Sequence, residues 1–284
     1  MTSTQRSFLS RHMPVVPRVL PRALPLVAAA CMAVLCASPV RAQSQEPSPA
    51  PAPGFWQDVR MSVAAKLWVN EWASWVGQDR DDGAGHTLTD FTTISGHRTA
   101  VIPAVSARWH DWLVSGSAFA ASRYALSGSG VTVHTARHES DVSIGHYVLP
   151  TVAVSAGWKT VRQVFGDQYH FAGPALGISG SAPLPGSPFA VYGSFAQGVF
   201  RATFGLPDAS GRTVFRARYN LSEFGFAYAQ GRSSLVPADL TWTVGYRQQS
   251  IVTLGYRGRA ASGTFEDKVR DTTQGLTLGM VLSY

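Results

Sequence analysis

Apolar side chains recur at every second position in segment after segment of this chain, and that period constrains the fold more than any other feature. Alternation with a period of two is typical of a β-strand with two unlike faces, whereas an amphipathic helix repeats every 3.6 residues. In the last segment, one face carries Leu276, Leu278, Met280, Leu282 and Tyr284. Segments with this alternation span 58–76, 93–109, 111–124, 134–148, 151–166, 168–182, 188–203, 212–230, 237–257 and 268–284. We therefore predict an all-β chain of about ten strands.

The face opposite the apolar one is small, rich in glycine and in places charged. A sheet packed on a hydrophobic core would not tolerate such a face, but a closed barrel with lipid outside and a polar lumen explains both faces. We predict a closed antiparallel transmembrane β-barrel over residues 58–284, with consecutive strands paired in a meander. In the first segment Val59, Val63 and Leu67 also fit a helical stripe, so a short helix is the alternative there.

Two kinds of connection separate the segments. Those after the even-numbered segments are mostly short, whereas several after odd-numbered segments are longer and more polar, at 78–90, 127–133, 206–211 and 258–267. Short periplasmic turns and longer external loops are typical of barrels in the outer membrane. An even number of strands also returns the C-terminus to the side of the N-terminus, as a barrel closed by its end strands requires.

Residues 1–42 have the layout of a secretory signal peptide. Four arginines precede a short apolar run at 24–37, and the sequence VRA ending at Ala42 resembles a cleavage site. A retained anchor is the alternative, but the apolar run is shorter than the ~20 residues that a transmembrane helix needs. Residues 43–57 are rich in Pro, Ala and Ser, which predicts a flexible periplasmic lead-in to the barrel.

Removal of the signal changes the composition of the mature chain. Both cysteines, Cys31 and Cys36, fall inside it, so the mature chain is predicted to have no thiol or disulfide chemistry. Five of the 24 basic residues leave with the signal and none of the 17 acidic residues does, which leaves 19 basic residues. A basic stripe for nucleic acid is therefore not indicated, and we predict no nucleic-acid partner.

Register is interrupted in a few segments. In 212–230 the apolar residues occupy odd positions up to 221 and even positions from 224 onward. A bulge near Ser222 and Glu223 would restore one outward face, and without it Glu223 would face lipid. Pro103 and Pro174 also lie within segments, which predicts local bulges or strand ends.

The predicted lumen is narrow. A barrel of about ten strands lies close to the ~8-strand size that side chains fill, and far from the 16–18 strands that leave an aqueous channel. We therefore exclude a general diffusion pore. By parity the lumen receives Lys66, Trp68, Asn70, Phe119, Arg123, Lys159, Tyr192, Arg216, Arg218, Glu223 and Arg247. Because charges in a narrow interior need partners or water, they form either a structural plug or a binding path for a small anionic or apolar solute.

A polar cluster marks the start of the fourth segment. It contains His134, Arg137, His138, Glu139 and Asp141. On a strand the two histidines lie roughly 13 Å apart, at ~3.3 Å per residue, so joint metal ligation would need a loop conformation. The cluster is either a solvated loop rim or, in a barrel enzyme, an outer-rim site built from His134, His138 and Asp141. No catalytic motif stands out, and we assign no catalytic residue, metal or cofactor.

Acidic and aromatic residues lie near the predicted strand ends. The loop at 78–90 contains Asp79, Asp81, Asp82 and Asp90. An acidic loop can bind Ca²⁺ through oxygen ligands, but this one lacks the spacing of an EF-hand, which favours solvation. Tryptophans near strand ends, which predict an aromatic belt at the membrane interface, are Trp56, Trp72, Trp75, Trp109 and Trp112.

The chain end, read as Leu276-x-Leu278-x-Met280-x-Leu282-x-Tyr284, resembles the C-terminal insertion signal of Gram-negative outer-membrane β-barrel proteins. The resemblance covers 276–284 as a motif and most of the mature chain in architecture. It implies a small outer-membrane barrel of the broad porin-like group, in contact with outer-membrane lipid. It also implies recognition by the barrel-assembly machinery after escort by periplasmic chaperones. We expect a structural, adhesive or narrow-transport role, and an enzyme acting on lipid A or phospholipid is the alternative.

Overall fold

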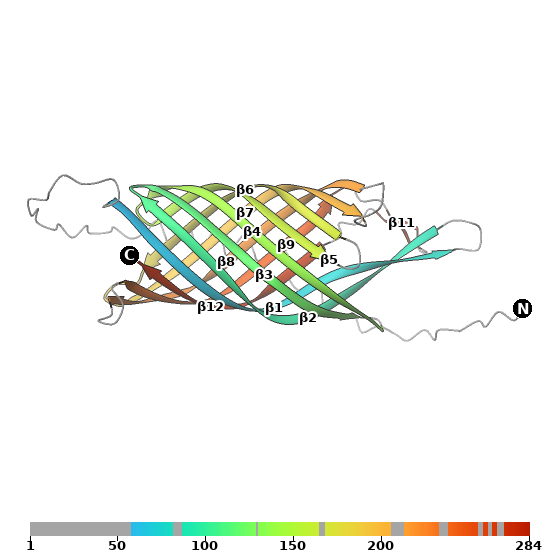
Figure 1. The fold of residues 1–284 in the computed structure, drawn as a ribbon, viewed down its shortest axis with the longest axis horizontal. Helices are drawn as coiled ribbons and strands as arrows, with labels where there is room; N and C mark the ends of the chain where they lie inside the picture. Colours follow the sequence, from blue (N-terminus) through green and yellow to red (C-terminus); the bar gives the residue numbers. More distant parts are fainter. Residues whose placement is uncertain are drawn as a thin grey trace, which may run out of the picture.

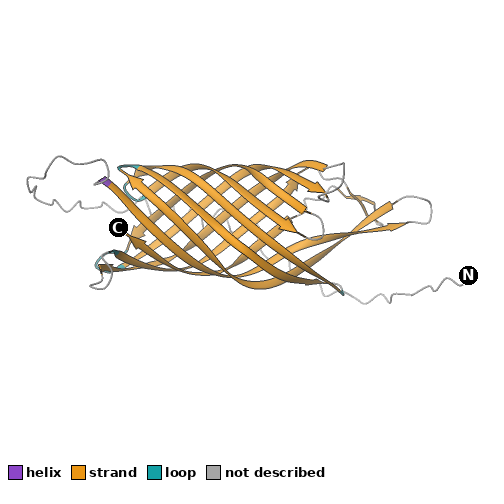
Figure 2. Ribbon diagram, in the orientation of Figure 1, coloured by secondary structure: helices purple, strands orange, loops and turns teal. Residues whose placement is uncertain are grey.

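Ten strands close into one antiparallel barrel in the computed structural model (Figure 1). The structure describes residues 58–81, 87–128, 130–164, 168–205, 213–232, 238–254, 258–260, 263–265 and 270–284. The barrel strands are β1 (Val59–Asp81), β2 (Thr87–Trp109), β3 (Trp112–Gly128), β4 (Val131–Leu149), β5 (Val152–Val164), β6 (Gln168–Pro183), β7 (Phe189–Gly205), β8 (Thr213–Arg232), β9 (Asp239–Leu254) and β12 (Arg270–Ser283). Strands make up nearly all of the described chain (Figure 2). The prediction of an all-β, closed, meandering barrel of ten strands is confirmed, and the first segment is a strand rather than a helix.

The C-terminal strand closes the barrel. β12 pairs with β9 on one side and with β1 on the other, in a register that runs from Ser62↔Ser283 to Ala73↔Thr272. The backbones of Met61 and Tyr284 extend this ladder with two hydrogen bonds, of 3.3 and 2.8 Å. The apolar chain end is thus a wall strand, paired on both edges.

The two ends of the barrel differ. At the end that holds the C-terminus, β2 and β3 are joined by a tight turn in which His110 has a φ of 51°, and two residues join β4 to β5. At the opposite end the hairpin of β1 and β2 continues beyond the wall (Figure 1). The long connection after β9 holds a separate two-stranded sheet, β10 (Gly258–Ala260) and β11 (Gly263–Phe265). Because short turns are periplasmic in outer-membrane barrels, we expect the projecting hairpin to lie on the outer side.

Two expected loops are mostly strand. The segment 78–90 was expected to be a loop, but β1 and β2 stay paired as far as Asp81↔Thr87, and the side chains of its four aspartates lie outside the described residues. The expected loop at 127–133 is a tight turn around Gly130, whose φ of +80° suits glycine. Polarity misled the prediction here because strands that extend beyond the lipid are polar on both faces.

Most of the outer face is apolar, as contact with lipid requires. Exposed apolar side chains alternate with interior ones, for example Val63 and Leu67 in β1 and Leu276 and Leu278 in β12. Trp109 and Trp112 are exposed next to the first short turn, where an interfacial belt was expected. These faces and the strand topology give the architecture of an outer-membrane β-barrel.

The expected belt does not include Trp72, which is fully buried inside the barrel. Even-numbered residues of β1 face the lumen, and Trp72 shares that face with Trp68. Trp56 and the side chain of Trp75 lie outside the described residues.

β8 contains no bulge near Ser222 and Glu223, contrary to the prediction. Its register with β7 runs without interruption from Phe189↔Tyr228 to Phe204↔Thr213, and its only shift against β9 lies between Ala229 and Gly231. Odd residues of β8 face the lumen throughout. The outer face of this strand lies in water over its first part and in lipid over its second part. Its apolar residues therefore face the lumen in the first part and the lipid in the second. A register shift does lie beside Pro103, between β2 and β3, whereas β6 keeps its register with β7 on both sides of Pro174.

Candidate functional site: an ion-paired network across the lumen

Most of the polar residues predicted to face the lumen do lie inside the barrel. Interior positions are held by Lys66, Trp68, Asn70, Phe119, Lys159, Tyr192, Glu223 and Arg247. Arg123, Arg216 and Arg218 are exposed on the outer face instead, which corrects the prediction for these three. In each case the neighbouring residue, such as Tyr124 or Tyr219, occupies the lumen.

Asp271 is the centre of the first part of the network. This carboxylate accepts hydrogen bonds from Trp72 Nε1 at 2.7 Å, from Arg137 Nη1 at 2.7 Å and from Gln163 Nε2 at 3.0 Å. The donors come from β1, β4 and β5, so one side chain of β12 connects strands on several sides of the barrel. Three donors on one buried carboxylate satisfy most of its hydrogen-bonding capacity.

Glu139 is the centre of the second part. It accepts hydrogen bonds from Arg137 Nε at 2.8 Å and from Gln249 Nε2 at 2.7 Å, and it forms an ion pair with Lys159 Nζ at 3.0 Å. Lys159 also lies 3.5 Å from Asp141. Arg137 therefore bridges Glu139 and Asp271, and the two parts form one network.

Glu223 forms a third group nearer the C-terminal end of the barrel. It pairs with Lys66 from β1 and with Arg247 Nη1 from β9 at 3.2 Å. Tyr192 Oη donates to the same carboxylate at 3.3 Å. Each of these three donors reaches Glu223 from a different strand.

Two of these hydrogen bonds cross the full width of the barrel. In the strand order β1-β12-β9-β8-β7-β6-β5-β4-β3-β2, β9 and β4 are five places apart and therefore diametrically opposite, as are β12 and β5. The bonds Gln249 to Glu139 and Gln163 to Asp271 join these opposite pairs. Side chains from opposite walls thus meet across the lumen at this level.

Aromatic side chains cover the buried cations. Arg137 lies over the ring of Trp72 at 5.0 Å, and Arg247 lies over the ring of Trp68 at 5.2 Å. Both tryptophans belong to an interior apolar cluster with Phe119. A second apolar cluster forms on the opposite wall and consists of Val161, Phe171, Phe200, Ala202, Ala217, Tyr219 and Ile251. Cation–π contacts favour guanidinium groups that are removed from water.

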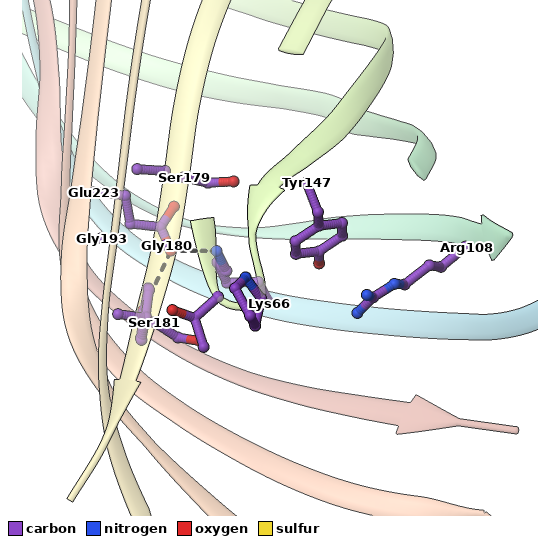
Figure 3. A pocket seen from close by; sticks show the side chains of 12 residues that line it. Lys66, Arg108, Tyr147, Ser179, Gly180, Ser181, Gly193 and Glu223 are labelled. Atoms are coloured by element: carbon purple, nitrogen blue, oxygen red, sulfur yellow. Dashed lines mark hydrogen bonds and ion pairs between the residues drawn. The ribbon is translucent and has the colours of Figure 1, made fainter. Parts of the chain in front are cut away.

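A polar cavity of about 430 Å³ lies at the short-turn end of the lumen, and we refer to it as the vestibule (Figure 3). Its lining residues are Lys66, Arg108, Tyr147, Pro150, Thr151, Ser179, Gly180, Ser181, Tyr192, Gly193, Ser194 and Glu223. The ion pair of Lys66 and Glu223 is part of its lining, and Arg108 lies over the ring of Tyr147 at 4.0 Å.

The residues suggested for an outer-rim enzyme do not meet. All lie on β4, where His134 and His138 are exposed on the outer face and Asp141 faces the lumen. The idea of a solvated loop rim is also wrong for Arg137 and Glu139, which are buried in the lumen.

Among the described residues no group of His, Cys, Asp or Glu side chains is arranged to hold a metal ion. No described helix is long and apolar enough to cross a bilayer.

Several residues of the network were missed from the sequence. They are Trp72, Tyr124, Gln163, Gln249 and Asp271, together with Arg137, Glu139 and Asp141, which were assigned to a rim. The alternation of residues between the two faces of each strand would have assigned these side chains to the lumen. Arg137, Glu139 and Asp141 lie two residues apart on β4, on the face opposite Val142 and Ile144, which are exposed. Asp271 likewise lies on the face opposite Leu276 and Leu278.

No protein-family model matches the chain, and no curated protein matches it either. Among solved structures, the outer-membrane protease OmpT of Escherichia coli is 11% identical and has a TM-score of 0.45, covering 79% of this chain and 97% of its own. The translocator domain of the autotransporter NalP of Neisseria meningitidis is 11% identical, with a TM-score of 0.39 and coverages of 78% and 88%. A FadL homologue of Pseudomonas aeruginosa is 8% identical, with a TM-score of 0.35 and coverages of 80% and 90%. These likenesses concern the barrel architecture and carry no argument about activity.

Proposed function

We propose that this protein is a closed, non-conducting outer-membrane barrel that anchors and displays the projecting hairpin of β1 and β2. The observation that supports this role best is the hydrogen bond of 2.7 Å between Gln249 and Glu139, which joins opposite walls of the barrel. A channel at this level would have to break this bond and the pair of Arg137 with Asp271, and separating a buried carboxylate from its cation is costly. A structural or adhesive role therefore fits the interior better than diffusion.

The hairpin is built to extend beyond the membrane. Among the described residues β1 pairs with β12 as far as Ala73, whereas it pairs with β2 up to Asp81↔Thr87. The remaining eight residues of β1 therefore form a two-stranded ribbon with β2, about 26 Å long at ~3.3 Å per residue. The edge of a two-stranded ribbon is a site to which another chain can bind by adding a strand. We propose adhesive display of this ribbon as the role of the barrel.

The proposed route to the membrane follows the sequence. A signal peptide at 1–42 would export the chain, chaperones of the periplasm would escort it, and the barrel-assembly machinery would recognise the end that contains Leu278, Met280 and Tyr284. The pairing of that end with β1 supports late closure of the barrel by the strand that carries the signal.

The experiment that tests a closed interior combines conductance with cysteine labelling. Reconstituted in planar bilayers, the full chain should give no discrete current. Because both native cysteines lie at 31 and 36, inside the predicted signal, single-cysteine variants of the mature protein are clean reporters. Thr277→Cys, at a buried interior position, should resist a membrane-impermeant maleimide, whereas Ser187→Cys in the exposed β6–β7 turn should react. Regular current steps together with rapid labelling of Thr277→Cys would rule out the closed barrel.

A second candidate function rests on the vestibule. Its volume of about 430 Å³ and its lining by Lys66, Arg108 and Glu223 suit a small polar or anionic solute. Narrow transport would then require release of the ion pair between Lys66 and Glu223. Uptake of small anions into proteoliposomes should be lost or altered in Lys66→Met, and the absence of any uptake by the unmodified protein would exclude this role.

A further inference from the structure

Arginine and histidine side chains gather on the outer face of the barrel just beyond the apolar band, on the side of the projecting hairpin. We name this set the collar, and it consists of His138, Arg162, His170, Arg201, Arg216, Arg218 and Arg270. All are exposed, and they come from β4, β5, β6, β7, β8 and β12. The strands β4 to β8 follow one another around the wall, and β9 lies between β8 and β12.

Strand register brings the side chains of the collar close together. Arg162 lies opposite His138 on one side and opposite His170 on the other. Arg201 lies directly opposite Arg216. Arg218 and Arg270 both lie opposite Val252, from either side. Like charges placed opposite each other across a ladder destabilise a sheet, so the pair of Arg201 and Arg216 calls for an anion.

The described part of the chain supplies no carboxylate to Arg201, Arg216, Arg218 and Arg270. Glu71 is the one acidic side chain that the described residues place on this outer surface beyond the apolar band, and it lies on β1, paired in register with Gln274 and His97. The acidic residues of β4, β8 and β12 point into the lumen and are used there. Within the described residues Arg201, Arg216, Arg218 and Arg270 make no ion pair, whereas Lys66, Arg137, Lys159 and Arg247 all do.

The height of the collar matches that of lipid head groups. In β7 Arg201 follows the exposed Val199 at the next outward position, and in β5 one outward threonine separates Arg162 from the exposed Trp158. Successive outward residues are about 6.6 Å apart along a strand. Long arginine side chains at this height keep their stems on apolar surface and their guanidinium groups in the polar layer. The ligand is therefore part of the membrane, at its outer surface.

We propose that the collar binds the phosphate groups of a phosphorylated glycolipid in the outer leaflet. Guanidinium groups bind phosphate oxygens in a bidentate manner, and cations on neighbouring strands about 4.8 Å apart can share one phosphate or hold two. Outward hydroxyl and amide groups between the arginines, such as those of Thr160 and Asn220, are suited to sugar hydroxyls. A zwitterionic phospholipid fits less well because its ammonium group would meet the same cations.

Native mass spectrometry of the full-length protein in detergent tests this proposal. The probes are diphosphorylated lipid A, the same lipid after removal of its phosphates, and phosphatidylethanolamine. The unmodified protein should retain the diphosphorylated form, with weaker binding at higher ionic strength, and should retain the other two poorly. Arg201→Gln with Arg216→Gln should weaken binding of diphosphorylated lipid A by at least about tenfold, since hydrogen bonds to charged groups are the strong ones.

Arg60→Gln is the matched control, because Arg60 is an exposed arginine at the opposite end of the barrel. It should bind lipid A like the unmodified protein. Heat-modifiable migration on gels checks that every variant has a folded barrel. Equal loss in Arg60→Gln, equal retention of the dephosphorylated lipid, or a preference for phosphatidylethanolamine would overturn the proposal.

Discussion

Replacing Glu139 by glutamine should destabilise the barrel strongly while leaving its shape unchanged. The side chain of Glu139 is almost fully buried and has contacts of 2.7 to 3.0 Å with Gln249, Arg137 and Lys159. Glutamine has nearly the same size, so the change removes the negative charge and creates no cavity. Arg137 would keep Asp271 at 2.7 Å, but Lys159 would keep only Asp141, at 3.5 Å, as an ion-pair partner among the described residues.

The size of the effect is set by Lys159, which loses its closest carboxylate. Breaking a buried ion pair by removing one member costs about 3–5 kcal/mol, because the other charge stays buried without compensation. We expect a decrease of this size in the free energy of unfolding, measured by urea titration in phospholipid vesicles with tryptophan fluorescence. Glu71→Gln is the control, since Glu71 lies on the outer surface and its replacement should change the free energy by no more than about 0.5 kcal/mol.

A double variant separates lost charge pairing from lost packing. Glu139→Met combined with Lys159→Met removes one anion and one cation and leaves the pair of Arg137 and Asp271 intact. The double variant should be more stable than Glu139→Gln, because replacing both members of a buried pair by apolar groups is often nearly neutral. A loss below about 1 kcal/mol in Glu139→Gln, or a double variant less stable than that single variant, would refute the assigned role of the network.

Two further predictions concern the wall of the barrel. Tyr284→Asp should reduce assembly in the outer membrane, measured by heat-modifiable migration, since this residue continues the ladder between β12 and β1; Ser187→Asp, in an exposed turn at the same end, should assemble normally, and equal assembly of both variants would contradict the assigned signal. Leu278→Arg, on the lipid face, should lower the free energy of unfolding by about 2–4 kcal/mol, whereas Gln274→Arg, beyond the apolar band, should lower it by about 0–1 kcal/mol. Equal costs at these two positions would mean that the band has been placed wrongly.

The alternation of β12 and of the first half of β1 was enough to predict the barrel, because lipid on one face and a lumen on the other impose a strict period of two. The same rule failed for Arg216 and Arg218. Both were assigned to the lumen by parity, because the apolar odd-numbered residues of this segment were taken as the face in contact with lipid. That expectation holds only within the apolar band, and β8 runs well beyond it. Parity alone does not say which face of a strand is inside the barrel. The position of the apolar band along the strand must also be known.

The network was less predictable than the fold, for a different physical reason. His134, His138 and Asp141 are close in sequence, but the pleat of β4 sends the histidines outward and the aspartate inward. Conversely, Glu139 and Gln249 are 110 residues apart and meet only because β4 and β9 lie on opposite sides of a closed ring. Partners across a lumen depend on strand order and stagger, which local sequence patterns do not contain.

Charge sorting between the two faces explains why the outer surface is a stronger candidate for ligand binding than the lumen. β5 places Lys159 inside and Arg162 outside, and the two side chains have different surroundings. Every cation of the interior network lies within 4 Å of a carboxylate, so the interior is already neutralised and an incoming solute would have to displace an existing partner. Arg201 and Arg216 face each other with no carboxylate among the described residues to separate them. An anion bound there would relieve repulsion rather than replace an ion pair, so the free energy available for binding is greater at the collar.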